Sequence, residues 1–266
     1  MGGATDDLIR SINEIEDLIA ALRARDRQKA LDALDDVGEA AIDPLINLLH
    51  QSEDADLRRA LVYFLDEIDD MRIVPALVDA LEHDPNADVR IGAATVLSHR
   101  PDARSIEPLI AAIHDTDLAV REEVVRALGL IGAELDSPRI IDALAQALHD
   151  SDWGTRQSAA EMMIRLEAPQ QEQAEQLLLA DLQNQDAEIR LGAAWSLVEL
   201  GDQRAGDVLA GLLDDENKLI SLNAAYGLAK LGDQRAVNTL TAALSDPDEW
   251  VRTTANIALR DLEGEP

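Results

Sequence analysis

The chain has 266 residues, of which 47% are hydrophobic and only 2% aromatic, and 53 acidic against 23 basic residues give a formal net charge of −30. The absence of cysteine excludes disulfides, thiolate metal sites and a cysteine nucleophile. A field of this sign repels phosphate groups, and no apolar run of about 18 residues occurs, so we expect no binding to nucleic acid, no membrane association and a cytoplasmic protein.

The chain repeats itself about every 31 to 35 residues. Most repeats have an acidic turn, an aliphatic residue, an arginine and then a helix rich in small residues, while the fifth has Thr155 at the aliphatic position and the seventh lacks the arginine. These signature arginines are Arg58, Arg90, Arg121, Arg156, Arg190 and Arg252. In the seventh unit Ser221 takes the position of the arginine, and Arg27 fits that position in the first unit. A fixed period of this length indicates stacked helical units, each of which contacts mainly its neighbours.

The predicted elements form eight pairs of helices within one domain, 1–266. The expected repeats run over about 8–43, 44–74, 75–107, 108–141, 142–174, 175–206, 207–237 and 238–262. Pro44, Pro75 and Pro108 are expected to open first helices, where a missing N–H costs little. Gly132, Gly201 and Gly232 are expected to end second helices in a left-handed conformation.

Four short patterns carry a resemblance to a known family. They are the opening Pro44-Leu45-Ile46, the turn Asp117-Leu118-Ala119-Val120-Arg121, the helix Ala93-Ala94-Thr95-Val96-Leu97 and the ending Gly201-Asp202. With these patterns the chain resembles the HEAT-repeat superfamily, in particular the short HEAT-like repeats of the phycobilisome-lyase type. The resemblance implies an all-α, right-handed solenoid of about eight helical hairpins.

The resemblance also implies a structural role for the charged residues of the turns. In the family, the turn aspartate and the arginine of successive repeats form a polar ladder along the stack. Carried over to this sequence, the ladder consists of Asp56, Arg58, Asp88, Arg90, Asp117, Arg121, Arg156, Asp186 and Arg190.

Four histidines occupy nearly the same position in successive repeats, seven or eight residues before the signature arginine: His50, His83, His114 and His149. Equivalent residues of packed helices lie roughly 10 Å apart, which is too far for shared coordination of a metal. The iron-binding HEAT-like hydroxylases use His-Glu pairs, and this chain contains no such dipeptide. We therefore predict a structural row of histidines at the ends of the first helices, and neither a metal site nor a cofactor.

A partner is expected to bind where the repeats differ. Five residues after the signature position stand Tyr63, Trp195 and Tyr226, which are half of the aromatic residues in the chain. This column is not a packing position, so it should face outward onto the concave surface that solenoids use for binding. Leu191 and Leu222, four residues earlier, are expected to join them in an apolar patch.

The sequence favours a monomeric, non-enzymatic scaffold that holds a partner segment with basic or apolar residues, and no catalytic residue is predicted. The alternatives from the resemblance are a phycobilisome-lyase-like enzyme or chaperone and, less favoured, an iron-dependent hydroxylase. The Asp-rich, Lys-poor composition is typical of halophilic proteins, although an ordinary acidic scaffold would have it too.

Overall fold

The computed structural model describes residues 2–24, 26–135, 137–166 and 170–263, and all regular structure in these ranges is helical. The chain falls into two compact units, Met1–Leu135 and Asp136–Pro266, each of which is described by itself. The single domain expected over 1–266 stays a prediction.

Unit 1 contains helices α1 to α8. Their bounds are α1 Gly2–Arg23, α2 Arg27–Val37, α3 Ile42–Gln51, α4 Ala55–Leu65, α5 Ile73–His83, α6 Ala87–Ser98, α7 Ala103–Ala112 and α8 Leu118–Glu134. A short 3-10 helix, Gly38–Ala41, precedes α3.

Unit 2 contains helices α9 to α16. Their bounds are α9 Pro138–Ala147, α10 Trp153–Ile164, α11 Gln170–Asp181, α12 Ala187–Glu199, α13 Ala205–Gly211, α14 Lys218–Lys230, α15 Val237–Ala243 and α16 Glu249–Glu263. The 3-10 helix Gln234–Ala236 leads into α15.

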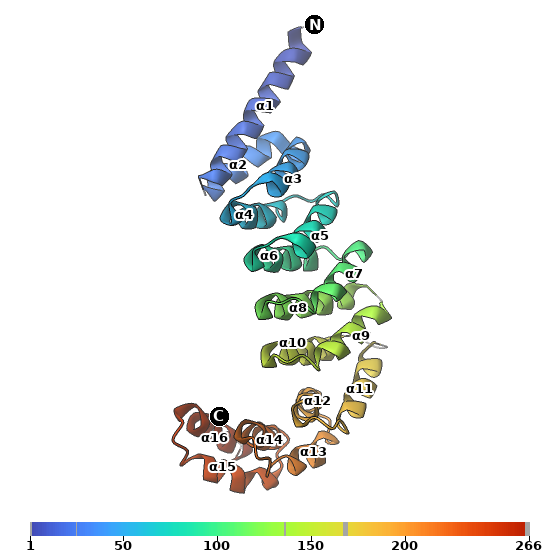
Figure 1. Ribbon diagram of the computed structural model, residues 1–266, viewed down its shortest axis with the longest axis vertical. Coiled ribbons are helices and arrows are strands. Elements are labelled where there is room, and N and C mark those ends of the chain that lie inside the picture. The colour runs from blue at the N-terminus through green and yellow to red at the C-terminus, as the bar shows by residue number, and fades with distance from the viewer. Residues whose placement is uncertain (1, 25, 136, 167–169, 264–266) are drawn as a thin grey trace. The chain divides into compact units, whose positions relative to one another are not determined.

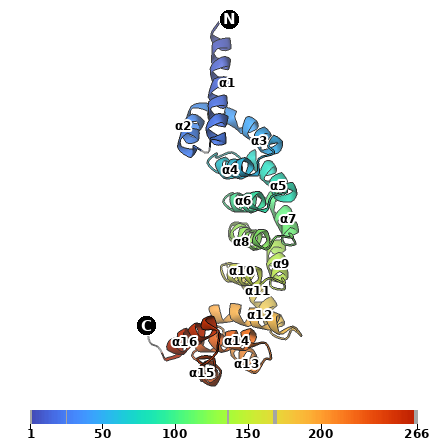
Figure 2. The same cartoon turned by 60° about the vertical axis from the view of Figure 1, so that its left-hand side comes forward.

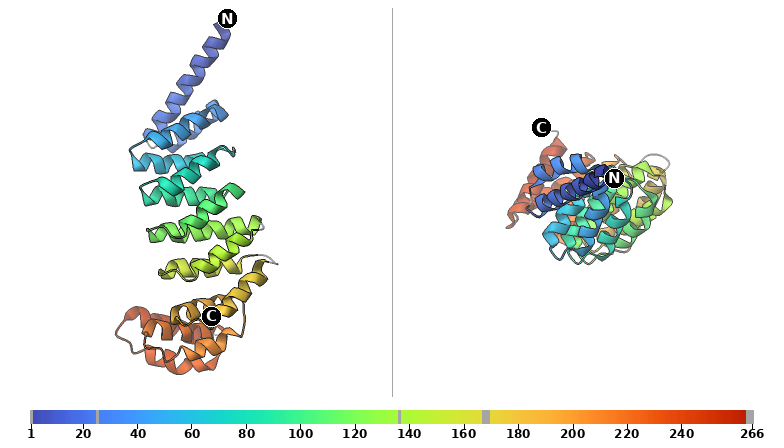
Figure 3. Two further views of the ribbon diagram at one scale, coloured as in Figure 1. Left: turned by 45° about the vertical axis from the view of Figure 1, so that its right-hand side comes forward. Right: turned by 90° about the horizontal axis from the view of Figure 1, so that it is seen from above.

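Successive helices pack as pairs, and the second helices of neighbouring pairs stack directly on one another. In unit 1 this stack is α4, α6 and α8, and first helices α5 and α7 lie beside them (Figure 1 and Figure 2). In unit 2 the stack is α10, α12, α14 and α16. Figure 3 shows the pairs of unit 1 as layers seen edge-on. The first pair packs differently, because its first helix, α1, contacts the second helix of the next pair, α4.

The acidic turns start the second helices. The side chains of Asp54, Asn86, Asp117 and Asn217 accept hydrogen bonds from free backbone N–H groups in the first turns of α4, α6, α8 and α14. Such caps satisfy donors that have no partner within the helix. The signature arginine is then the fourth residue of its helix.

Two of the three expected glycine caps are confirmed. Gly201 and Gly232 both have φ of +72°. At the first, the N–H of Asp202 donates to the Leu197 carbonyl at 2.8 Å, and the N–H of Gly201 donates to Val198 at 2.9 Å. These two bonds define a Schellman ending. The prediction for Gly132 is wrong, because the glycine is buried inside α8, which continues to Glu134.

The prolines do not open their helices. Pro44 and Pro75 are the third residues of α3 and α5, where a backbone N–H would still lack a partner within the helix. Pro108 lies in the interior of α7. The reason is that Asp102 starts α7 earlier, by accepting a hydrogen bond from the N–H of Arg104 at 2.7 Å.

Candidate functional site

The column five residues after the signature position lies at the surface of the second helices. Tyr63 is 44% exposed and Ile257 47%. Trp195 and Tyr226 are half-buried. The column therefore presents side chains to solvent, and it changes from one repeat to the next, unlike the Ala and Leu positions of the core.

Leu191 and Leu222 do not belong to this surface. They are only 1% and 2% exposed, so the expected apolar patch does not include them. An offset of four residues rotates a side chain by about 40° around an α-helix. Here this rotation is enough to turn both leucines from the surface into the core.

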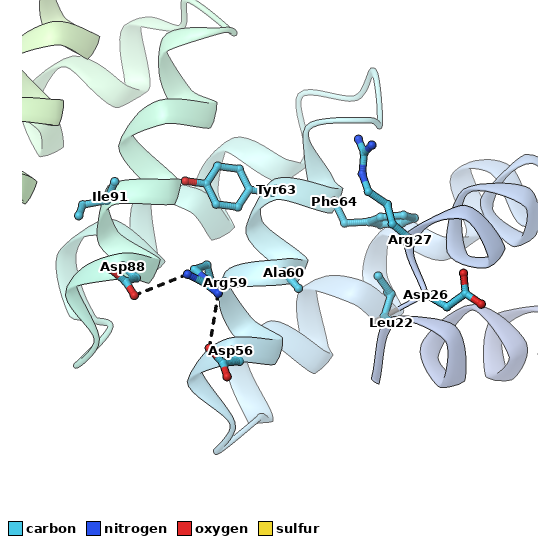
Figure 4. A pocket seen from close by; sticks show the side chains of 10 residues that line it. All are labelled: Leu22, Asp26, Arg27, Asp56, Arg59, Ala60, Tyr63, Phe64, Asp88 and Ile91. Atoms are coloured by element: carbon cyan, nitrogen blue, oxygen red, sulfur yellow. Dashed lines mark ion pairs between the residues drawn. The ribbon is translucent and has the colours of Figure 1, made fainter. Parts of the chain in front are cut away.

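The first cleft, called the Tyr63 cleft below, lies in unit 1 and has a volume of about 430 Å³. Its lining combines apolar, aromatic and charged side chains of α1, α2, α4 and α6, as Figure 4 shows. The lining residues are Leu22, Asp26, Arg27, Asp56, Arg59, Ala60, Tyr63, Phe64, Asp88 and Ile91.

The charges of the Tyr63 cleft are arranged around Arg59. Its guanidinium lies 3.6 Å from Asp56 and 3.7 Å from Asp88, which belong to consecutive repeats. At the far side of the cleft, Arg27 pairs with Glu67, and Asp26 caps α2 through the N–H of Lys29. Three aspartates and two arginines therefore line the cleft.

The second cleft, called the Trp195 cleft below, lies in unit 2 and has a volume of about 600 Å³. It opens between α10, α12 and α14. The lining residues are Arg156, Gln157, Ala160, Glu161, Ile164, Arg165, Gly192, Trp195, Ser196, Glu199, Asn223, Tyr226 and Lys230.

The rings of Trp195 and Tyr226 form an edge-to-face pair, with centroids 5.4 Å apart and planes at 71°. The ammonium of Lys230 lies 5.5 Å from the centroid of Trp195 and also pairs with Glu199. The indole Nε1 of Trp195 is buried without a hydrogen-bond partner within the described part of the chain. The spacing of 31 residues thus brings together the two aromatic residues that the sequence singled out.

The signature arginines form a ladder, but their carboxylate partners differ from those expected. Arg58 donates two hydrogen bonds to Asp84, at 2.6 and 2.9 Å, and Arg90 donates two to Asp115, both at 2.8 Å. Each partner stands in the turn of the next repeat. Asp84 and Asp115 are the first acidic residues after α5 and α7. They therefore precede Asp88 and Asp117, the residues expected for the ladder.

The aspartates named for the ladder have other roles. Asp56 and Asp88 are exposed in the first turns of α4 and α6, and Asp117 and Asp186 are the N-caps of α8 and α12. The role expected for these four aspartates in the ladder stays a prediction. The charge of Asp117 is one of those that raise the pKa of Arg90.

All the remaining signature arginines hold their own turn. Each donates to the backbone carbonyl six residues earlier: Arg121 to Asp115, Arg156 to Asp150, Arg190 to Asn184 and Arg252 to Asp246. Arg156 also pairs with Glu188 at 2.6 Å. In the repeat without the arginine, Lys218 reaches Asp246 at 2.7 Å, and Ser221 donates to the Leu213 carbonyl.

The ladder keeps its carboxylates ionised. Burial alone would raise the pKa of Asp84, but hydrogen bonds from Arg58 and from the N–H of Asn86 outweigh it and hold the pKa below its usual value. For Asp115, burial is likewise outweighed by Arg90 and the N–H of Asp117, so its pKa is also lowered.

A second set of arginines, which the sequence reasoning missed, joins neighbouring repeats at the starts of the first helices. Its signal is Asp-x-Arg, in which the arginine folds back onto the aspartate: Asp70 with Arg72, Asp102 with Arg104, Asp202 with Arg204 and Asp233 with Arg235. Each arginine also contacts the preceding repeat, at Glu39, the Met71 carbonyl, Glu175 and Asp207.

Three of the four histidines in the row, His50, His83 and His149, pair with aspartates of the first helices. His50 lies 3.5 Å and His83 3.2 Å from the carboxylate of Asp79, and His149 lies 2.9 Å from Asp181. Within the residues that the structure describes, no three His, Asp or Glu side chains are grouped so that they could hold a metal ion. Over the same residues, no helix combines the length and the apolar character needed to cross a bilayer.

Comparison with family models identifies HEAT repeats over almost the whole chain. The matches cover residues 15–97, 74–165, 141–226 and 208–266. Comparison with curated protein sequences gave no match.

Solved structures of repeat proteins resemble the chain at low sequence identity. Kap95p in its complex with RanGDP has a TM-score of 0.64 at 14% identity, and the match covers 95% of this chain and 40% of Kap95p. The CpcE–CpcF phycocyanin lyase of Nostoc sp. gives 0.42 at 19%, with 83% and 92% covered. Human deoxyhypusine hydroxylase gives 0.40 at 22%, with 99% and 100% covered. The Kap95p match supports the solenoid fold and nothing more specific.

Proposed function

Because the chain belongs to the HEAT-repeat family, we propose that it is a non-enzymatic scaffold that binds a segment of a partner protein along its second helices. HEAT repeats typically mediate protein binding, and stacked repeats offer long surfaces for it. The partner segment carries basic or apolar residues, since a chain with a net charge of −30 attracts the former and aromatic side chains hold the latter.

One observation carries this proposal. The Tyr63 cleft and the Trp195 cleft lie in different units, yet both open on second helices. Aromatic residues of the same column line them, Tyr63 in the first and Trp195 with Tyr226 in the second. Surface aromatic side chains in preformed clefts are the usual anchors of a protein interface. A column that served packing alone would instead repeat the small residues found elsewhere in these helices.

The proposal is tested with a library of displayed dodecapeptides selected on the immobilised full-length chain. We expect each enriched peptide to lose at least tenfold in affinity in one of two variants of the chain. The first variant is Tyr63→Ala, and the second combines Trp195→Ala with Tyr226→Ala. Leu118→Ala is the matched control, because Leu118 is an exposed apolar residue, 56% exposed, that lines neither cleft. Peptides that bind all variants equally, or a selection without enrichment, would refute the proposal.

The other expectations have their own tests. Phycobilisome-lyase-like activity predicts bilin absorbance on the purified protein or bilin transfer to an acceptor. Iron-dependent hydroxylation predicts stoichiometric iron. The halophilic origin of the acidic surface, also a proposal, is tested by the salt dependence of stability given in the Discussion.

A further inference from the structure

Two consecutive arginines of α4 have opposite environments. Arg58 is locked: its side chain is 10% exposed, and it donates two hydrogen bonds to Asp84, whose side chain is 6% exposed. Arg59 is 46% exposed, and it lies 3.6 and 3.7 Å from Asp56 and Asp88, which are 53% and 64% exposed. These distances exceed those of hydrogen bonds, and ion pairs so open to water contribute little.

The loosely held guanidinium lines the Tyr63 cleft between Asp56 and Asp88, as Figure 4 shows. The ring of Tyr63 forms the adjoining wall and lies over Gly92, where an added Cβ would come within 3.3 Å of Tyr63 Cε2. A cation in this position has carboxylates of two repeats on one side and an aromatic ring nearby. The side chain that now occupies it belongs to the chain itself.

We propose that the Tyr63 cleft receives a lysine or arginine side chain of a partner segment, and that Arg59 is the chain's own occupant of that position, which the partner displaces. The inference rests on the proposed function and names the chemistry of one of its two clefts. The incoming cation gains Asp56, Asp88 and the neighbouring ring of Tyr63, while Arg59 moves into water at little cost. The net charge of −30 increases the rate at which basic segments arrive.

The test uses three labelled dodecapeptides built from Leu and Ala, with Lys, Glu or Gln at the same four positions. Each is titrated against the full-length chain by fluorescence anisotropy in about 0.1 M NaCl. We expect the Lys peptide alone to bind. Its Kd should fall about fivefold with Arg59→Ala, because the competing cation is removed, and rise about three- to tenfold with Asp88→Asn or Tyr63→Ala.

Arg260→Ala is the matched control for the change in net charge. Arg260 is an exposed arginine in the last turn of α16, outside both clefts and outside the column five residues after the signature position, so its loss makes the chain more negative by the same amount. We expect the Kd of the Lys peptide to change less than twofold in this variant. An equal gain with Arg260→Ala and Arg59→Ala would reduce the effect to long-range attraction and overturn the inference.

Other outcomes also decide the matter. A Kd that stays constant or rises in Arg59→Ala overturns the inference, as does failure of the Lys peptide to bind either form. If the Lys peptide fails while library peptides bind at the Trp195 cleft, the inference is lost and the proposed function stands. If no peptide binds at either cleft, both are lost.

Discussion

The guanidinium of Arg58 in α4 holds the carboxylate of Asp84, 26 residues further along the chain, through two hydrogen bonds of 2.6 and 2.9 Å. Its third contact, at 3.0 Å, is the carbonyl of Ser52 in its own turn. One side chain thus ties the turn of one repeat to the turn of the next. Arg90 does the same with Asp115 and the Asp84 carbonyl, so the two arginines form consecutive links in unit 1.

Arg58→Ala should lower the free energy of unfolding by about 3 kcal/mol, because it leaves the buried carboxylate of Asp84 without its partner. The measurement is a urea titration followed by circular dichroism. Arg59→Ala, the neighbouring exposed arginine, is the control and should cost less than about 1 kcal/mol. Equal costs for the two variants would mean that the ladder has no special role in stability.

The ladder should make stability depend on acid pH. The pKa of Asp84 and that of Asp115 are lowered in the folded protein, while an unfolded aspartate titrates near 3.9. Their contribution is therefore complete above the unfolded value and is lost as the pH falls from about 4 through the folded pKa.

This dependence is measured as the urea midpoint between pH 6 and pH 3. The loss on acidification should be steeper in the wild type than in a variant with Arg58→Ala and Arg90→Ala. Comparing the two cancels the general relief of charge repulsion that protonation brings to so acidic a chain. Parallel curves would contradict the assignment of the acid sensitivity to these pairs.

Substitutions at two glycines should have opposite signs. Gly201→Ala should destabilise the fold by about 1 kcal/mol, because φ of +72° is unfavourable for a residue with a Cβ. Gly192→Ala should stabilise it by about 0.5 to 1 kcal/mol, since Gly192 lies within α12 and a Cβ there would have no atom within 4 Å. Thermal melts of both variants give the comparison. A change in melting temperature of the same sign in both would show that the left-handed conformation at Gly201 does not determine the effect of replacing glycine.

Stability should rise with salt. With 53 acidic and 23 basic residues, self-repulsion opposes the compact state at low ionic strength, and added salt screens it. The melting temperature should increase steadily between about 0.05 and 2 M KCl. No increase over this range would count against the halophilic interpretation of the composition.

The agreement between sequence and structure is closest where a rule is local. Gly201 and Gly232 end their second helices as expected, because a left-handed helix end depends on a few residues that are adjacent in the chain. The predicted helix ends were wrong where another residue nearby determined the start or the end of the helix. Asp102 starts α7 ahead of Pro108, and α8 continues past Gly132.

Contacts between repeats were predicted less well. The period indicates which residues are equivalent, but not which carboxylate an arginine side chain reaches, and Arg58 reaches Asp84 instead of the expected turn residue. In the same way, Leu191 and Leu222 were placed at the surface on helical spacing alone, which cannot separate a position at the edge of a buried face from one just outside it.

The sequence by itself therefore determined the repeat, its helical pairs and the column in which Tyr63, Trp195 and Tyr226 stand, since each follows from periodicity and local backbone preference. Only the tertiary structure decided that Trp195 meets Tyr226 edge to face, and that Arg58 is locked while Arg59 lies loosely in a cleft. These relations depend on how far one helix is rotated and shifted against the next. Packing of the whole layer determines that geometry, and no short stretch of sequence encodes it.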